Sequence, residues 1–351
     1  GGYLMQESAS LWVALGKTIK QAVLAMTGAP WVAELVHTLA GVVGILSIIL
    51  LSALVLVYLE RKVCAWMQMR LGPNRLGPYG IFQTIADIIK LMTKEDIQPA
   101  QVSPVMWGLA PVLLFMAAMT TYAVIPFDAG VIFADLNIGI FFFVAVGSQA
   151  TLPMLMAGWA SNNKYAMVGG MRTVAQMISY EIPLVFSLLG VVMITGSMKM
   201  SDIVKAQEGM WFIVTQPIAF LIYLIASVAE TNRTPFDLVE AESELVAGPF
   251  TEYSGMRWAY FFLAEYAFMV GASCIAATLF LGGWNGPFLP GWIWFFLKVA
   301  AMIFLFMWFR WTFPRIRVDQ LMSFGWKVLL PLSIVNVVVT GIGLWLFFPL
   351  G

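Results

Sequence analysis

The stretch VHTLAGVVGILSIILLSALVLVYLE (residues 36–60) decides the fold class. Its one carboxylate, Glu60, comes at its end. About 20 apolar residues suffice to cross a bilayer as a helix, and only helices satisfy the backbone of such a run. Seven further runs of this kind follow, at roughly 104–126, 136–159, 172–196, 211–230, 256–281, 291–313 and 325–349. We predict an all-α protein, a polytopic transmembrane helix bundle of about eight spans.

The basic residues predict which loops share a side of the membrane. One arrangement gathers 14 of the 19 Lys and Arg residues into four loops on the same side. The positive-inside rule makes that side cytoplasmic and places both chain ends outside. The inner loops are then residues 61–103, 160–172, 230–257 and 310–327.

The N-terminal segment, residues 1–30, is expected to lie on the outer surface. Apolar residues recur there at helical spacing, which favours a short interfacial helix. A signal peptide is rejected because no short apolar region with a small-residue cleavage site follows the lysines. Residues 31–351 are predicted to form a single integral membrane domain.

Cysteine and histidine are too scarce for a redox centre. The chain has two cysteines, Cys64 and Cys274, and one histidine, His37. Iron–sulfur clusters usually need four thiolates, and haem needs axial ligands. We predict no bound metal and no cofactor on this chain. Packing explains both cysteines.

Residues 229–255 (AETNRTPFDLVEAESELVAGPFTEYSG) carry an unusual concentration of acid in a chain with only 11% charged residues. Neighbouring carboxylates cannot all ionise independently, so they suit proton handling. Arg233, near the start of the stretch, and Arg257, just after it, could act as countercharges. The other interpretation is a solvated acidic loop, although its prolines and aromatic residues indicate defined turns. The acids are Glu230, Asp237, Glu240, Glu242, Glu244 and Glu252.

Two carboxylates are predicted at matched depth inside the membrane. Glu181 follows Arg172 by about nine residues, and Glu265 follows Arg257 by about eight, so both lie roughly 12–14 Å inside at ~1.5 Å per residue. Asp135 is near the outer end of the third span. Intramembrane acids are costly, which favours a proton relay. The alternative is a neutral carboxyl group that hydrogen-bonds for packing.

An amphipathic helix of about 15 residues is expected after span one. It follows the turn RLGPNRLGP (70–78), whose Gly-Pro pairs stop a helix. One face carries Ile81, Phe82, Ile85, Ile88, Ile89 and Met92, and Asp87 and Lys90 on the other can pair. It is predicted to lie along the cytoplasmic interface, either as a plain surface helix or as a docking surface or pocket wall.

These same segments resemble one family, the H subunit of bacterial respiratory complex I (subunit 1 in mitochondria). The resemblance runs through nearly every inner loop. Its segments include LERK (59–62), RLGPNRLGP (70–78), ADIIKLMTKEDIQP (86–99), GWASNNKYAMVGGMR (158–172), ISYEIPL (178–184), AETNRTPFDLVEAESELVAG (229–248), AEY (264–266) and DQLMSFGWK (319–327).

The resemblance implies a membrane subunit of a proton-pumping NADH:quinone oxidoreductase in the bacterial inner membrane. On its own such a chain would have no activity, and in the complex it forms the wall and entrance of the quinone chamber. Quinone is the substrate. Flavin and iron–sulfur clusters belong to partner subunits, which include those of the quinone site and the neighbouring small membrane subunits.

The resemblance also assigns residues to the two tasks. Quinone binding would fall to Glu60, Arg61, Asp87, Lys90 and Arg75. Proton coupling would fall to Glu181, Glu230, Glu240, Glu242, Glu244 and Glu265, with Arg233 as countercharge and Asp135 as a further candidate.

The chain departs from the family pattern at two positions, and two other functions compete with the one that the resemblance implies. Val239 replaces a common proline, and Gln149 replaces a glutamate found in some relatives. One alternative function is the homologous subunit of a membrane-bound hydrogenase. The other is a stand-alone proton-coupled transporter, against which stands the lack of a convincing internal repeat.

Overall fold

The computed structural model describes residues 18, 20–21, 23–25, 29–239 and 242–347. Most of segment 1–30, with its predicted interfacial helix, lies outside the described residues, as does Glu240. Within the described ranges the chain is helical and has no β-strand. The predicted fold class, a polytopic helical bundle, is confirmed.

The long helices follow the predicted spans. Pro at the first turn begins two of them, α2 and α4, because its missing N–H would have no helical partner there. Asn163 caps α7 by accepting from the Tyr165 backbone N–H, and Gly196 ends it in the left-handed conformation. These helices are α2 (Pro30–Met67), α4 (Pro104–Thr121), α5 (Gly139–Ser148) with α6 (Thr151–Ala160), α7 (Lys164–Thr195), α12 (Gly255–Phe280), α13 (Gly291–Thr312), and α14 (Val318–Phe324) with α15 (Leu330–Phe347).

Short elements connect them. A π-helical turn, η4 (Gly325–Leu329), joins α14 to α15. The others are the 3₁₀ turns η1 (Pro78–Gly80), η2 (Tyr122–Val124) and η3 (Gly248–Phe250), and the helices α3 (Gln83–Thr93), α8 (Met200–Ala206) and α11 (Glu242–Leu245).

The span predicted over residues 211–230 is broken in two. α9 (Phe212–Thr215) and α10 (Pro217–Glu230) meet at Gln216, whose backbone is not helical (φ −130°, ψ 54°). Pro217 has no N–H to continue a helix from α9, so it starts a new one. Seven helices of the described chain are long and apolar enough to cross a membrane, and α10 is a shorter apolar helix beside them.

A helix follows span one as predicted. α3 leaves its stripe of Ile85, Ile88, Ile89 and Met92 uncovered by protein, from 42% to 65% exposed. An apolar stripe left open in this way suits a helix on a membrane surface. The proposed Asp87–Lys90 pair is replaced by a contact between α3 and α2, described below.

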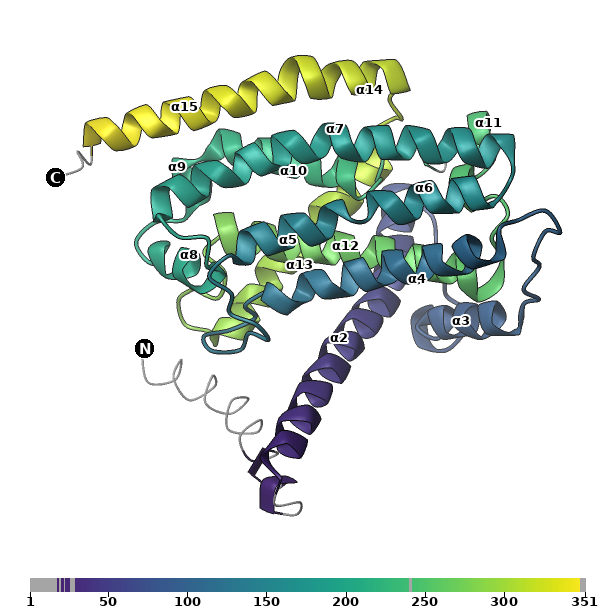
Figure 1. Cartoon of the computed structure of the whole chain (residues 1–351), viewed down its shortest axis with the longest axis horizontal. Helices are drawn as coiled ribbons and strands as arrows, with labels where there is room; N and C mark the ends of the chain where they lie inside the picture. Colours follow the sequence, from purple (N-terminus) through teal and green to yellow (C-terminus); the bar gives the residue numbers. More distant parts are fainter. Residues whose placement is uncertain (1–17, 19, 22, 26–28, 240–241, 348–351) are drawn as a thin grey trace.

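The centre of the bundle is α12. In an apolar 18-residue stretch of α12, 78% is buried, against 17% for α2 and 22% for α14–α15. α12 is therefore the core, and the other two helices lie at the periphery. Glycine allows close helix contacts: a Cβ on Gly158 of α6 would lie 2.7 Å from the Ala166 carbonyl oxygen of α7. Figure 1 shows α3 and α11 at one end of the bundle and α8 and α9 at the other.

Candidate functional site

Arg233 lies in the loop after α10 and points into the protein, with its side chain only 2% exposed. Its Nη1 is 3.1 Å from Glu60 Oε2 of α2, and its Nε is 2.7 Å from Glu265 Oε1 of α12. The guanidinium also lies 4.4 Å from the ring centre of Tyr266. Arg233 therefore joins the end of the first span to the central helix.

Glu60 receives two further contacts. The Tyr266 hydroxyl donates to its Oε2 at 2.5 Å, and Arg310 Nη1 of α13 lies 2.7 Å from its Oε1. We call Glu60, Arg233, Glu265, Tyr266 and Arg310 the Arg233 cluster. With two carboxylates and two guanidiniums it is charge-balanced, which is the condition for keeping ions in a buried site.

The pKa of Arg233 reflects these contacts. Burial alone would lower the pKa, because it disfavours the charged form. The charges of Glu265 and then Glu60 outweigh burial and raise the pKa above its ordinary value. The guanidinium therefore stays charged at any physiological pH.

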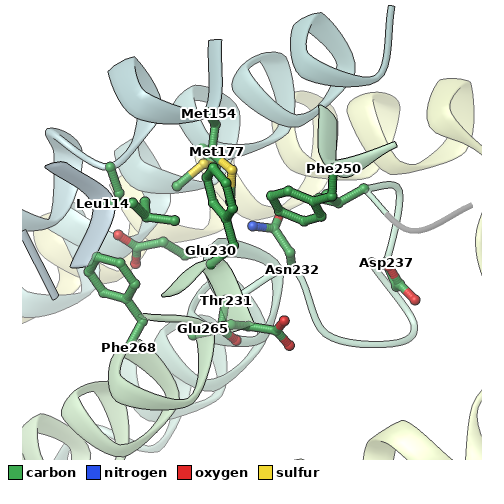
Figure 2. Close-up of a pocket in the computed structure, with 13 residues that line it drawn as sticks. Leu114, Met154, Met177, Glu230, Thr231, Asn232, Asp237, Phe250, Glu265 and Phe268 are labelled. Carbon is green, nitrogen blue, oxygen red and sulfur yellow. The ribbon is translucent and has the colours of Figure 1, made fainter. Parts of the chain in front are cut away.

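A small cavity of about 30 Å³ lies beside the cluster. Figure 2 shows Glu230 and Glu265 among its lining residues, with Phe250 and Phe268. One water needs roughly 10–15 Å³, so the cavity has room for one or two waters. Glu230 of α10 and Glu265 of α12 therefore line the same small cavity.

Glu181 of α7 continues this line of acids. Its charge and that of Glu230 interact, and the Ser148 hydroxyl lies within hydrogen-bonding reach of it. Close packing at Gly147 brings α5 to Glu230, since a Cβ there would lie 3.4 Å from Glu230 Oε1. The family resemblance placed Glu181, Glu230 and Glu265 on one route, and the structure brings them into one region.

Among the described residues, the acids of the acidic loop pair not with Arg233 and Arg257, as we expected, but with other arginines. Asp237 pairs with Arg315 at 3.0 Å, and exposed Glu244 pairs with Arg172 at 2.6 Å. Arg233 turns inward, and Arg257 pairs with Asp96 at 3.0 Å. The loop's countercharges among the described residues thus come from α7 and the segment after α13. Glu240 lies outside the described residues, and Glu242 begins α11.

The predicted quinone-binding residues fall into two groups. Arg61 of α2 pairs with Asp87 of α3 at 2.6 Å, which ties the first span to the surface helix. Lys90 and Arg75 are exposed on α3 and on the turn before it. Glu60 is instead a buried member of the Arg233 cluster.

Asp135 lies away from all of these residues. It pairs with Lys199, the N-cap of α8, at 2.9 Å, and accepts from the Ser201 hydroxyl in the first turn of α8. The hydrogen bond and charge of Asp135 raise the pKa of Lys199. Asp135 therefore takes part in a surface ion pair at the far end of the bundle.

Sequence reasoning missed three residues. Arg310 and Tyr266 complete the Arg233 cluster. Their signals were available, because Arg310 falls inside the apolar run 291–313 and Tyr266 belongs to the AEY segment. Lys298 is a buried amine of α13 that donates to the Gly283 and Asn285 carbonyls and lies 4.6 Å from the Trp211 ring centre.

The part of the chain that the structure describes has no group of three or more His, Cys, Asp or Glu side chains placed to hold a metal ion. Cys64 and Cys274 are both buried and unbridged. The fold and the site together define a polytopic helical membrane protein that buries a charge-balanced ionic cluster at the base of an acidic loop.

Known proteins match this chain over most of its length. A family model described as NADH dehydrogenase matches residues 40–341. The H subunit of NADH-quinone oxidoreductase from Carboxydothermus hydrogenoformans is 52% identical over 343 residues, which cover 96% of this chain and 98% of that protein. The H subunits of the same enzyme from Geobacillus kaustophilus (54% identity, 81% and 86% coverage) and Dehalococcoides mccartyi (52%, 87% and 86%) are also similar.

The chain belongs to the family of NADH-quinone oxidoreductase H subunits, and it is a membrane component of complex I. The resemblance seen in the sequence is thereby confirmed. The hydrogenase and stand-alone transporter alternatives are not favoured. Other complex I subunits are its partners.

Proposed function

We propose that this chain forms the membrane-side wall and entrance of the quinone chamber and couples quinone reduction to proton translocation. One observation carries the proposal. Arg233 lies between Glu60 and Glu265. Glu60 adjoins the surface formed by the end of α2 and by α3, which we call the α2–α3 surface, and Glu265 lines the small cavity. A single buried cation thus contacts both the predicted chamber residues and the predicted coupling residues.

The α2–α3 surface suits the chamber wall. Arg61 and Asp87 hold α3 against the end of α2, and exposed Lys90 and Arg75 add positive charge beside them. An amphipathic helix at the interface presents its apolar face to lipid and its polar face to the chamber. The quinone ring would meet polar groups here while its apolar tail stays in the membrane.

Coupling would follow from charge balance. Quinone reduction consumes protons and changes the charge next to Glu60. Buried ion pairs respond strongly to such a change, because little solvent screens them. Arg233 would then shift its pairing between Glu60 and Glu265, and Glu265 would exchange a proton through cavity water with Glu230. Glu181 would pass it onward, and the 240–244 acids would serve as the inlet.

The setting of the chain completes the proposal. α3 and α11 lie at the cytoplasmic end, both chain ends are outside, and the membrane is the bacterial inner membrane. Residues 31–351 act as one integral membrane domain behind the segment 1–30. The flavin and iron–sulfur clusters that deliver electrons are held by partner subunits.

The test uses the assembled complex with Glu265→Gln and Glu181→Gln, each isosteric and unable to ionise. Quinone reductase turnover and proton uptake into sealed vesicles are measured per assembled complex. Both activities should fall together in both variants. Glu208→Gln, an exposed acid beyond α8, is the control and should leave both unchanged. Full pumping in both test variants would refute the proposal.

A further inference from the structure

Gln176 of α7 is a fully buried amide next to the loop that carries Arg233. Its Nε2 donates to the Ala229 carbonyl oxygen at 2.7 Å and to the Phe236 carbonyl oxygen at 2.7 Å. Ala229 is in the last turn of α10, before Arg233, and Phe236 is after it. One side chain therefore bonds both ends of the loop.

The amide nitrogen of a glutamine suits this position, although the buried Gln176 Oε1 finds no hydrogen-bond partner among the described residues. Its amide nitrogen has two N–H groups and no charge, which matches two carbonyl oxygens. The opposite amide orientation would place oxygen against oxygen, so the contacts fix the orientation. The Asn232 side-chain oxygen, 3.4 Å away, lies on the same side. A glutamate would present acceptors to acceptors, and an asparagine is one methylene too short.

The loop needs such a fixed point. Asn232 has a left-handed backbone (φ 53°), which is uncommon for a residue with a side chain. The loop's own bonds, Arg233 N–H to the Val228 carbonyl and Phe236 N–H to the Arg233 carbonyl, are local. They do not join the end of α10 to Phe236. Gln176 does so from a separate helix.

We propose that Gln176 is a positioning residue for Arg233: by closing the loop between Ala229 and Phe236, it sets the guanidinium between Glu60 and Glu265. The inference rests on the proposed function of the Arg233 cluster. The Gln176 amide bonds to the loop's carbonyl oxygens rather than to the charged groups of the cluster, so its effect passes through the backbone.

The chain provides a matched control. Gln207 is also buried, and its Nε2 donates to the Ile203 and Thr278 carbonyl oxygens at 3.2 and 2.9 Å. It follows α8, at the opposite end of the bundle from α11 (Figure 1). Gln207→Met therefore removes two hydrogen bonds of the same kind, together with the two that the Gln207 Oε1 accepts from the Phe212 and Gly282 N–H groups, without touching the Arg233 loop.

The experiment compares Gln176→Met and Gln207→Met in the assembled complex, each alone and combined with Arg233→Lys. The kcat and the KM for quinone are measured per assembled complex. We expect Gln176→Met to lower kcat more than about fivefold, the factor given by ~1 kcal/mol, with little change in KM. In the Arg233→Lys background the same change should lower kcat less than about twofold, because coupled residues are not additive.

The outcomes separate the two hypotheses. If Arg233→Lys alone leaves kcat unchanged, the proposed function is wrong. The positioning role is wrong, and the proposed function stands, if Arg233→Lys lowers kcat but Gln176→Met does not. The same holds if Gln176→Met lowers kcat by one factor in both backgrounds and that factor equals the effect of Gln207→Met. Should Gln176→Met fail to assemble, Gln176→Asn, which keeps an amide on a shorter chain, enters the same comparison.

Discussion

Removing the charge of Arg233 should destabilise the protein strongly. Removing the carboxylate of Glu265 as well should restore most of the stability. Arg233→Gln leaves Glu265 and Glu60 without the cation that lies 2.7 and 3.1 Å from them. Breaking a buried ion pair on one side costs about 3–5 kcal/mol, because a charge stays buried without its partner. A cost of ~3 kcal/mol shifts an equilibrium roughly a hundredfold.

Two double variants carry the comparison. Arg233→Gln with Glu265→Gln leaves Glu60 paired with Arg310 and bonded to Tyr266, so the remaining charges stay balanced. Arg233→Gln with Glu60→Gln removes the same amount of charge but takes the carboxylate away from Arg310. The first double variant should come within about 1 kcal/mol of the wild type, since neutral replacement of a whole pair is often nearly neutral.

The assay is thermal inactivation of the assembled complex in lipid nanodiscs, followed by the fraction that remains assembled. The expected order of stability is wild type, then the Glu265 double variant, then the Glu60 double variant and the Arg233 single variant. If the Glu265 double variant loses as much stability as the single variants Arg233→Gln and Glu265→Gln added together, Arg233 and Glu265 are not energetically coupled. The reasoning from the cluster would then be refuted.

Two smaller changes test the rest of the site. Tyr266→Phe removes a hydrogen bond to the buried Glu60 carboxylate, so it should cost about 1.5–3 kcal/mol of stability in the same thermal assay. A loss under about half a kcal/mol would mean that the arginines alone hold Glu60. Glu244→Gln breaks an exposed pair with Arg172, for which ~0–1 kcal/mol is expected. It should also change pumping less than about twofold, because neighbouring acids can replace one inlet acceptor; a large loss of pumping at unchanged stability would make Glu244 an essential step.

The spans and the surface helix could be predicted because they depend on local properties. A run of apolar residues determines that a segment enters the membrane, whichever helices surround it. The break before Pro217 was equally local, and the proline itself was the signal for it. The count of spans differed from the structure only where a proline divided an apolar run.

Charge pairing could be predicted only in part. Sequence spacing placed Glu181 and Glu265 at similar depth, and family resemblance named Glu60 and Arg233. The two tasks assigned to these residues looked separate in the sequence. The structure shows that Arg233 contacts one residue from each set, Glu60 and Glu265.

The sequence by itself determined the helical membrane fold and the residue types available for proton coupling. Hydrophobicity and turn chemistry act over a few residues, so they can be read along the chain. Only the tertiary structure decided which acid each arginine neutralises. Arg233 lies among the six acids of its own stretch, yet it pairs with Glu60, 173 residues away, and with Glu265. Packing of α2, α12 and α13 around the loop brings these groups together, and buried charges bind where their partners are also buried.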